Sequence, residues 1–308
     1  VRVATSKLLK EQIPLRLAYF ANVFHAQEHE GGRPAEFEQM GVELIGDDSV
    51  FADAEMIITA SELVQELGIN SYRLTVGHAG LLQSILTQLT QSDQQVRELR
   101  KLLVEKNMVG FEEVVRTFGL SNEEEQRFIE FIGQASNVQS IQQLRPFIDE
   151  TNDSQVTMYS YLSELSSLLE NAGLAKLVTY DLTLTSEMSY YTGMLFEVFA
   201  SGSGFAIGNG GRYDGLLQEF NSDVGATGFG LRVDRLLEVM TTTMKREPHT
   251  LIFFDPANYV NAVHKAKKLR NQGIRTTIQF IGNVEDKEAF QANFTDVVWL
   301  IEGDGNNE

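Results

Sequence analysis

SYYTGMLFE, at residues 189–197, and GGRYDG, at residues 210–215, are the most informative stretches of this chain. Apolar, β-favouring residues at 194–200 are followed by Ser-Gly-Ser-Gly at 201–204, a turn composition, and by a second short apolar run at 205–208. We therefore expect a β-hairpin here, with the paired tyrosines just before its first strand. The paired glycines of the second stretch would by themselves indicate only a turn.

Further strands and helices flank this hairpin. Buried-strand patterns occupy residues 16–24, 176–184 and 225–231, and the last of them runs into a helix from residue 233 to about 244. Residues 53–67 show helical spacing, with acids in the first turn and a glycine just past the end. Strands joined by hairpins and gathered around a helical block predict an α+β fold with an antiparallel sheet.

Two changes of pattern divide the chain. Residues from about 93 to 173 are polar and helical, with a capping box at 121–124, and predict a helical insertion in a core domain that spans residues 1–246. A strand, a helix and two further strands then follow in short succession. Residues 250–308 are therefore expected to form a second, small α/β domain.

Composition restricts the classes of partner. The chain has 308 residues, with 43 acidic and 25 basic side chains, a net charge of -18 and no cysteine. That charge has the wrong sign for a surface that must neutralise a phosphate backbone, so we expect no nucleic acid as main partner. Without cysteine there is no disulfide framework, and no leader or long apolar run is present, so a cytoplasmic protein with no membrane association is expected.

Residues 24–43, FHAQEHEGGRPAEFEQMGVE, resemble motif 2 of the class II aminoacyl-tRNA synthetases, in its histidyl form. In that family, a strand ending Phe-Arg-x-Glu turns through a Gly-Arg loop into a strand reading Glu-Phe-x-Gln-x-Gly-x-Glu. The resemblance places His25 where the family has an ATP-gripping arginine and Gln27 where it has a glutamate, while Arg33 is kept. An always-charged guanidinium holds phosphate oxygens in a way that a mostly neutral imidazole does not.

Two more stretches resemble the same family. Residues 184–193, LTSEMSYYTG, are similar to its Leu-Val-Arg-Gly-Leu-Asp-Tyr-Tyr-Thr-Gly motif, with Ser186 at the place of the activating arginine. Residues 228–236, GFGLRVDRL, resemble motif 3, Gly-Phe-x-x-Gly-Leu-Glu-Arg-Leu. Arg235 is kept there, but Arg232 replaces the small glycine that lets adenine lie against the sheet. The resemblance therefore implies a degenerate nucleotide site.

The amino-acid pocket of the family is intact in the sequence. By resemblance, Glu43 and Tyr191 would address the two imidazole nitrogens of histidine, because a carboxylate accepts one N–H and a phenol can donate or accept at the other nitrogen. Gln39 would hold the α-amino group, and Tyr190 and Tyr213 would line the pocket. Each of these residues taken alone is more often a packing or solvated side chain, so the prediction depends on the three motifs occurring together.

Within the histidyl family, this combination resembles the regulatory subunits of ATP phosphoribosyltransferase, synthetase paralogues that pair with a short catalytic subunit. The resemblance implies a chain without catalytic activity, cofactor or tRNA, for which L-histidine is the feedback ligand in the first step of histidine biosynthesis. It also implies a homodimer within a hetero-octamer. The C-terminal domain resembles a truncated anticodon-binding domain, and the dimer-forming motif 1 is absent from the sequence, so the native chain is longer or that interface is lost.

Two other functions remain open at this point. The first is an active histidyl-tRNA synthetase, with Arg33 and Arg235 supplying the cationic groups. The second is a metal site, because residues 25–29 spell His-x-x-Glu-His, a metal-binding pattern when it lies on one helical face. Here the pattern follows a predicted strand and runs into two glycines, which favours exposed loop histidines without a metal ion.

Overall fold

The computed structural model describes residues 1–9, 13–24, 36–90, 92–185, 190–240 and 248–302. They form two compact units, Val1–Thr241 and Thr242–Glu308, each with its own buried core. Among the described residues, no helix is both long enough and apolar enough to cross a membrane. The two units are described separately below.

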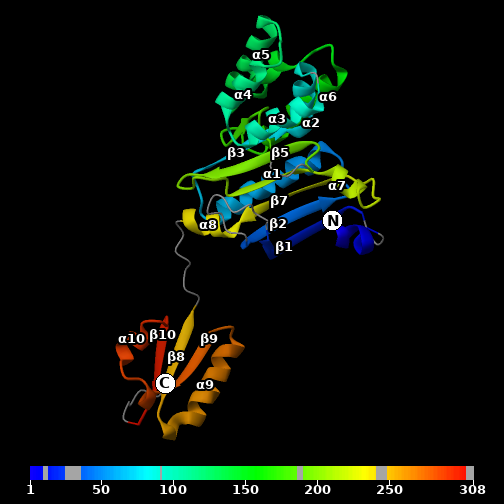
Figure 1. Ribbon diagram of the computed structural model, residues 1–308. Helices are drawn as coiled ribbons and strands as arrows, with labels where there is room; N and C mark the ends of the chain where they lie inside the picture. The colour runs from blue at the N-terminus through cyan, green and yellow to red at the C-terminus, as the bar shows by residue number, and fades with distance from the viewer. Residues whose placement is uncertain (10–12, 25–35, 91, 186–189, 241–247, 303–308) are drawn as a thin grey trace. The chain divides into compact units, whose positions relative to one another are not determined.

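A seven-stranded sheet forms the centre of the first unit (Figure 1). Its order is β1-β2-β7-β6-β5-β3-β4, and neighbouring strands are antiparallel except for the parallel pair of β3 and β4. This confirms the predicted antiparallel α+β arrangement. The strands are β1 (Leu15–Phe24), β2 (Glu36–Ile45), β3 (Tyr72–His78), β4 (Val178–Tyr180), β5 (Met194–Ala200), β6 (Gly208–Arg212) and β7 (Ala226–Arg232).

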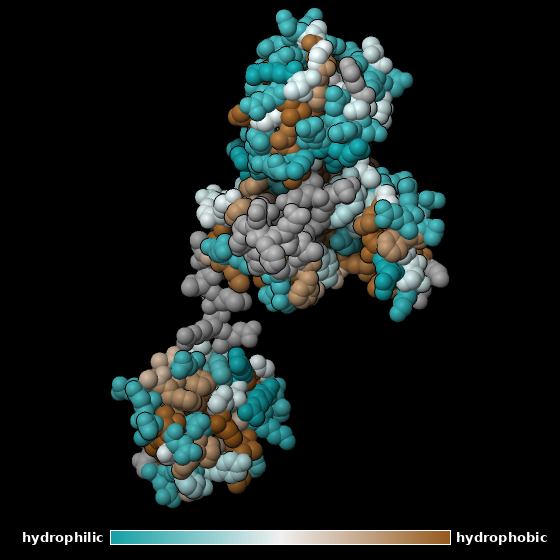
Figure 2. All heavy atoms as spheres, viewed as in Figure 1, coloured by the Kyte–Doolittle hydropathy of each residue, from teal (hydrophilic) through white to brown (hydrophobic). Residues whose placement is uncertain are grey.

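Helices cover the sheet and build a separate block beside it. Helix α1 packs against β2, β6 and β7, and α2 to α6 lie together beyond β3 and β5 (Figure 1). Most of the surface of this helical block is hydrophilic on the face shown in Figure 2. The helical segments are η1 (Ala4–Leu8), α1 (Val50–Glu66), α2 (Ala79–Leu89), α3 (Asp93–Val104), α4 (Met108–Arg116), α5 (Asn122–Gln134), η2 (Ile141–Phe147), α6 (Asp153–Asn171), α7 (Asp214–Gln218) and α8 (Val233–Val239).

One continuous core joins the sheet to these helices. Leu44, Phe196 and Leu231 of the sheet share it with Ile57 of α1 and Leu165 of α6, and all five side chains are fully or almost fully buried. Because strand side chains alternate between faces, the strand residues next to these point to the opposite face of the sheet. That opposite face carries the site described below.

Several predicted elements are confirmed, with small shifts of their ends. The predicted helix 53–67 is α1, which begins earlier because the Ser49 side chain accepts a hydrogen bond from the Ala52 N–H, and which ends before Gly68 with φ +77°. The capping box of Ser121 and Glu124 starts α5. The predicted helix after β7 is shorter than expected, because Met240 is extended.

Two strand predictions are wrong in detail. The second hairpin strand is β6, at Gly208–Arg212, and not residues 205–208, so the paired glycines lie within a strand and not in a turn. A Cβ at Gly210 would lie 2.5 Å from the Gly228 carbonyl oxygen, so only glycine fits this close approach. The predicted strand 176–184 shortens to β4, because Asp181 accepts hydrogen bonds from the Thr183 N–H and hydroxyl and turns the chain.

The second unit has a three-stranded parallel sheet, in the order β10-β8-β9. Phe253 stacks near Trp299, with ring centroids 4.5 Å apart, and Ala262 and Ala266 of α9 are fully buried. The predicted βαβ pattern is thus confirmed. The elements are β8 (His249–Phe254), η3 (Pro256–Asn258), α9 (Tyr259–Asn271), β9 (Arg275–Phe280), η4 (Ile281–Asn283), α10 (Lys287–Gln291) and β10 (Asp296–Leu300).

Candidate functional site

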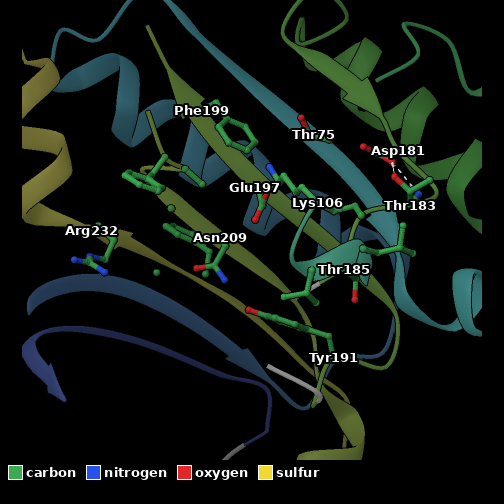
Figure 3. Close-up of a pocket in the computed structure, with 18 of the residues that line it drawn as sticks. Thr75, Lys106, Asp181, Thr183, Thr185, Tyr191, Glu197, Phe199, Asn209 and Arg232 are labelled. Atoms are coloured by element: carbon green, nitrogen blue, oxygen red, sulfur yellow. Dashed lines mark hydrogen bonds between the residues drawn. The ribbon is translucent and has the colours of Figure 1, made fainter. Parts of the chain in front are cut away.

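A cavity of about 880 Å³ opens on the face of the large sheet opposite α1. Register across the strands explains its lining, because residues paired on neighbouring strands point to the same face. Figure 3 shows Asn209 between Arg232 and Tyr191 in the view, with Glu197 of β5 beyond it. One row of paired residues runs straight across six strands through Tyr19, Gly41, Gly230, Asn209, Glu197 and Thr75. All of them except Gly41 line the cavity.

All described residues predicted to bind an amino acid line this single cavity. Gln39 and Glu43 come from β2, Tyr190 and Tyr191 from the segment before β5, and Tyr213 from the residue after β6. The structure therefore brings together side chains that are separated by up to about 170 residues. Arg232 and Arg235, predicted for the nucleotide site, line the same cavity.

Glycines on β7 make room for the polar side chains of β2. A Cβ at Gly228 would overlap the Glu43 carboxyl group, and a Cβ at Gly230 would overlap the Gln39 amide. Both polar side chains therefore lie flat over the neighbouring strand. Any larger residue at either glycine would displace the polar side chain that lies over it.

Tyr19 is a pocket residue that the sequence motifs did not reveal. It pairs with Gly41 in the β1–β2 ladder, where a Cβ would lie 2.5 Å from its hydroxyl, and that hydroxyl accepts a hydrogen bond from Gln39 Nε2 at 3.0 Å. Burial, reinforced by the nearby Glu43 carboxylate, raises the pKa of Tyr19 to about 12. The signal in the sequence is a tyrosine on one strand opposite a glycine on the next strand. Such pairs are too common to identify a site.

Glu43 is the titratable centre of the pocket. Burial raises its pKa to about 7, although the hydrogen bond from the Tyr213 hydroxyl to Glu43 Oε2, at 2.5 Å, works in the opposite direction. The carboxyl group is thus poorly solvated and near its titration point at neutral pH. A ligand N–H that donates to it would favour the charged form and would replace the water lost by burial.

Three tyrosines surround this carboxyl group. The Tyr190 ring lies 4.7 Å from the Tyr191 ring and 6.0 Å from the Tyr213 ring, between centroids. Burial raises the pKa of Tyr190, Tyr191 and Tyr213, and all three therefore stay protonated hydrogen-bond donors at neutral pH. A small polar ring with one N–H and one acceptor nitrogen matches such a set of a carboxyl group and phenols.

At the C-terminal end of β7, on the same face of the sheet, an arginine side chain occupies the space over the strands. The Arg232 guanidinium lies 3.6 Å from the centroid of the Phe37 ring and pairs with Asp234, with Nε–Oδ1 and NH2–Oδ2 distances of 3.0 and 2.6 Å. Arg235 donates to the Ala206 carbonyl oxygen and lies 5.1 Å from the Phe205 ring. Both guanidinium groups are thus already engaged by neighbouring residues of the chain.

Four predicted site residues lie outside the described residues: His25, Gln27, Arg33 and Ser186. The His-x-x-Glu-His pattern at residues 25–29 lies there as well. In the part of the chain that the structure describes, no group of three or more His, Asp or Glu side chains is arranged to hold a metal ion. The predictions for these positions stay predictions.

The far end of the cavity holds polar residues that the sequence did not single out. Lys106, from the turn between α3 and α4, reaches along β5 toward Glu197 in Figure 3, and its Nζ lies 5.6 Å from the Phe199 ring centroid. Burial raises the pKa of Glu197, and Lys106 partly offsets this. Lys106 has φ +54°, a conformation uncommon for a side chain of this kind. The helical block thus contributes directly to the cavity wall.

Comparison with known proteins identifies the family of this chain. The family model described as histidyl-tRNA synthetase matches residues 1–236, and that described as histidyl-tRNA synthetase HisZ, C-terminal domain, matches residues 251–302. Fold and pocket therefore define a protein of the class II synthetase type, in its histidyl form. The chain is 54% identical over 299 residues to the ATP phosphoribosyltransferase regulatory subunit of Lysinibacillus sphaericus strain C3-41, covering 96% of this chain and 76% of that protein. It belongs to the family of ATP phosphoribosyltransferase regulatory subunits.

Other relatives support the same assignment. The regulatory subunit of Bacillus subtilis strain 168 is 40% identical over 302 residues, covering 97% of this chain and 76% of that protein. A crystal structure described as an ATP phosphoribosyltransferase regulatory subunit/histidyl-tRNA synthetase from Bacillus halodurans has a TM-score of 0.86 at 35% identity, over 97% of this chain and 77% of that one. Histidyl-tRNA synthetase from Nostoc sp. PCC 7120 shares the fold, with a TM-score of 0.75 at 17% identity, over 95% and 69% of the chains.

Proposed function

We propose that this chain is the non-catalytic, histidine-sensing subunit of an ATP phosphoribosyltransferase. L-histidine binds between Glu43 and Tyr191, and its presence is passed to a short catalytic subunit that performs the first step of histidine biosynthesis. The assembly is a hetero-octamer that contains homodimers of this chain. Catalysis belongs to the partner subunit.

The arrangement of Glu43 carries this proposal. Its carboxyl group lies flat over Gly228, accepts a hydrogen bond from the Tyr213 hydroxyl and is mostly buried. It lines the cavity, so its remaining oxygen lone pairs can accept an N–H of a bound ligand. Gln39, held by Tyr19 over Gly230, adds a second polar group in the same cavity, two residues along β7 from the glycine under Glu43. A histidine ring and its α-amino group match these two positions.

The arginine side of the cavity argues against nucleotide chemistry. Arg232 stacks on Phe37 and pairs with Asp234, so the space over β7 that a flat base would need is filled by a side chain. A guanidinium bonded to its own chain gives less stabilisation to an added phosphate than one that is free to form a bidentate pair. The pocket thus keeps ligand recognition without an open nucleotide site.

The first experiment measures phosphoribosyl-ATP formation from ATP and phosphoribosyl pyrophosphate by a purified short catalytic subunit. The assay is run with and without this chain, and then with added L-histidine. We expect activity to appear only in the mixture and to fall with histidine. No activation by this chain would contradict the proposal.

Two variants test the assigned site. Glu43→Gln and Tyr191→Phe are expected to assemble with the catalytic subunit and to resist histidine, because each loses one hydrogen bond to the imidazole. A loss of about 1–3 kcal/mol corresponds to roughly 5- to 150-fold weaker binding, measurable by titration calorimetry and as the histidine concentration for half-inhibition.

Matched controls exist elsewhere in the same unit. Glu55→Gln alters an exposed carboxylate that pairs with Arg16, and Tyr180→Phe alters a buried tyrosine that donates to Ser166. Both controls should leave histidine binding unchanged. If Glu43→Gln and Tyr191→Phe are inhibited by histidine like the wild type, the site assignment is wrong.

An active histidyl-tRNA synthetase is the alternative that the same samples can exclude. A synthetase would exchange pyrophosphate into ATP in a histidine-dependent reaction. We expect no such exchange, because the family's activating arginine is replaced by Ser186. Exchange at a rate proportional to the amount of this chain would favour the synthetase instead.

A further inference from the structure

A buried cluster joins the last residue of β6 to two helices on the opposite side of the sheet from the cavity. Arg212 of β6 and Asp53 of α1 are 6% and 0% exposed. Arg212 Nε donates to Asp53 Oδ2 at 2.8 Å, and the Tyr161 hydroxyl of α6 donates to the same oxygen. A single carboxylate oxygen thus connects the sheet, α1 and the helical block.

The cluster adjoins the pocket at two points along the chain. Tyr213, which donates to Glu43, directly follows Arg212. The Thr192 N–H, one residue after Tyr191, donates to the Arg212 carbonyl oxygen at 2.9 Å. Both walls of the proposed histidine site are therefore within one residue of the backbone that carries the Arg212 side chain. Displacement of either wall by a ligand acts on that backbone.

The cluster is incompletely satisfied. Within the described residues, Asp53 Oδ1 is buried and has no hydrogen-bond partner. Arg212 uses NH1 and NH2 for longer contacts of 3.2 Å to the carbonyl oxygens of Asp47 and Ser49, and of 3.3 Å to Asp214 Oδ1. A guanidinium can instead serve both oxygens of one carboxylate as a fork. In such a fork, Asp53 Oδ1 would be satisfied at the expense of the longer contacts.

Tyr161 connects this arrangement to the rest of the helical block. Its ring lies edge-on to His78, 5.8 Å between centroids, and His78 Nδ1 accepts the Leu81 N–H at 3.1 Å and so caps α2. Burial lowers the pKa of His78 to about 4, so this cap stays neutral and intact across the physiological range. A change at Asp53 reaches α6 and α2 through contacts that are already formed.

We propose that Arg212 is a positioning residue that transmits occupancy of the cavity through the sheet to α1 and α6, by way of Asp53 and Tyr161. This deepens the proposed histidine-sensing function and rests on it. The residues do not touch the ligand. They set the position of the helical block according to whether the pocket walls are occupied.

Tyr161→Phe is the sharpest test, because it removes one hydroxyl and keeps the ring against His78. Tyr159→Phe is its matched control, since Tyr159 lies on the same helix but donates to the Ile141 carbonyl oxygen, away from the cluster. Histidine affinity is measured by calorimetry for each chain, alone and in complex with the catalytic subunit. Reciprocal coupling in the wild type should change the affinity by roughly 5- to 150-fold between the two states.

We expect Tyr161→Phe alone to bind histidine within about threefold of the wild type, while its affinity ratio between complex and free chain falls toward one. Tyr159→Phe should keep the wild-type ratio. A wild-type ratio in Tyr161→Phe, or an equal loss in both variants, would overturn the inference while leaving histidine binding intact. A wild type that fails to bind histidine would overturn the proposed function itself, and the inference with it.

Hydrogen exchange on the wild-type chain gives a second, variant-free measurement. Saturating histidine should slow amide exchange in α6 and α2, which have no residue in contact with the predicted ligand position. Helix α9 of the second unit serves as the internal reference and should not change. Protection confined to the pocket strands, with α6 unaffected, would overturn the transmission through Asp53.

Discussion

Glu43 shows how a single side chain can be placed for a ligand at a cost to the unliganded fold. The missing Cβ of its neighbour Gly228 leaves space for the carboxyl group over the strand, and burial removes that group from water. A carboxylate in such a place prefers to be protonated. The protonation of Glu43 thus changes near neutral pH, and the pH dependence of stability tests its burial directly.

The pH test follows from the sign of the shift. The folded pKa of Glu43, about 7, lies above the ordinary glutamate pKa of 4.5, so its contribution to stability is complete below about pH 4.5 and is lost as the pH rises through 7. The full difference corresponds to about 3 kcal/mol. We expect the free energy of unfolding of Glu43→Gln to fall less than that of the wild type between pH 5 and pH 8, measured by urea denaturation.

The comparison has its own control. Glu55→Gln removes an exposed carboxylate whose pKa is lowered by the hydrogen bond with Arg16, so it should not remove the wild-type loss of stability above pH 5. Parallel pH curves for the wild type and Glu43→Gln would show that the Glu43 carboxyl group is hydrated in the folded chain.

At the scale of the element, the glycines of β7 leave room for side chains of the neighbouring strand, β2. The pocket-facing positions of β7, Gly228 and Gly230, leave the space that Glu43 and Gln39 of β2 fill. Glycine weakens a strand because it packs no side chain and loses more backbone freedom on folding. The strand therefore gives up stability to create a recess.

Alanine at two glycines separates recognition from folding. In Gly230→Ala the atoms nearest the new methyl group all belong to the flexible Gln39 side chain, so we expect a near-normal melting temperature and roughly 5- to 150-fold weaker histidine binding, from the loss of one polar contact. In Gly210→Ala the methyl group would lie 2.5 Å from the Gly228 carbonyl oxygen, so the melting temperature itself should drop. Thermal scans and calorimetry on both variants check this contrast.

The spacing of apolar residues was sufficient to predict the strongly amphipathic helices and strands. It failed to predict the ends of elements that contain glycines or that end at a turn held by side-chain hydrogen bonds. Helix α1 and strand β5 follow from apolar spacing, but β6 was placed too early because its glycines carry no hydrophobic signal. In the site, Glu43 and Gln39 were recognisable from motif wording. Tyr19 and Lys106 were not, because their places in the cavity depend on strand pairing and on a turn in the helical block.

At the scale of the whole molecule, the two units have separate buried cores. The core of the second unit is small, with Ile252, Ala262 and Ala266 at its centre. We expect two transitions in differential scanning calorimetry. Histidine should raise the midpoint temperature of only the transition that belongs to the first unit. At a hundredfold excess over Kd, the added free energy of unfolding is about 2.7 kcal/mol. In Glu43→Gln the same histidine concentration should move that transition less. A single transition, raised as a whole by histidine, would mean that the units unfold together.

The strand order has a consequence for when the pocket is completed during synthesis. Strand β2, near the start of the chain, lies beside β7, and the pocket needs residues from both. A nascent chain that has emerged from the ribosome only as far as β5 holds Glu43 and both neighbouring tyrosines but lacks the glycine floor and Tyr213. On the proposed function, histidine in the cell can therefore stabilise only chains completed to about Arg232, and a fragment truncated earlier lacks the complete pocket.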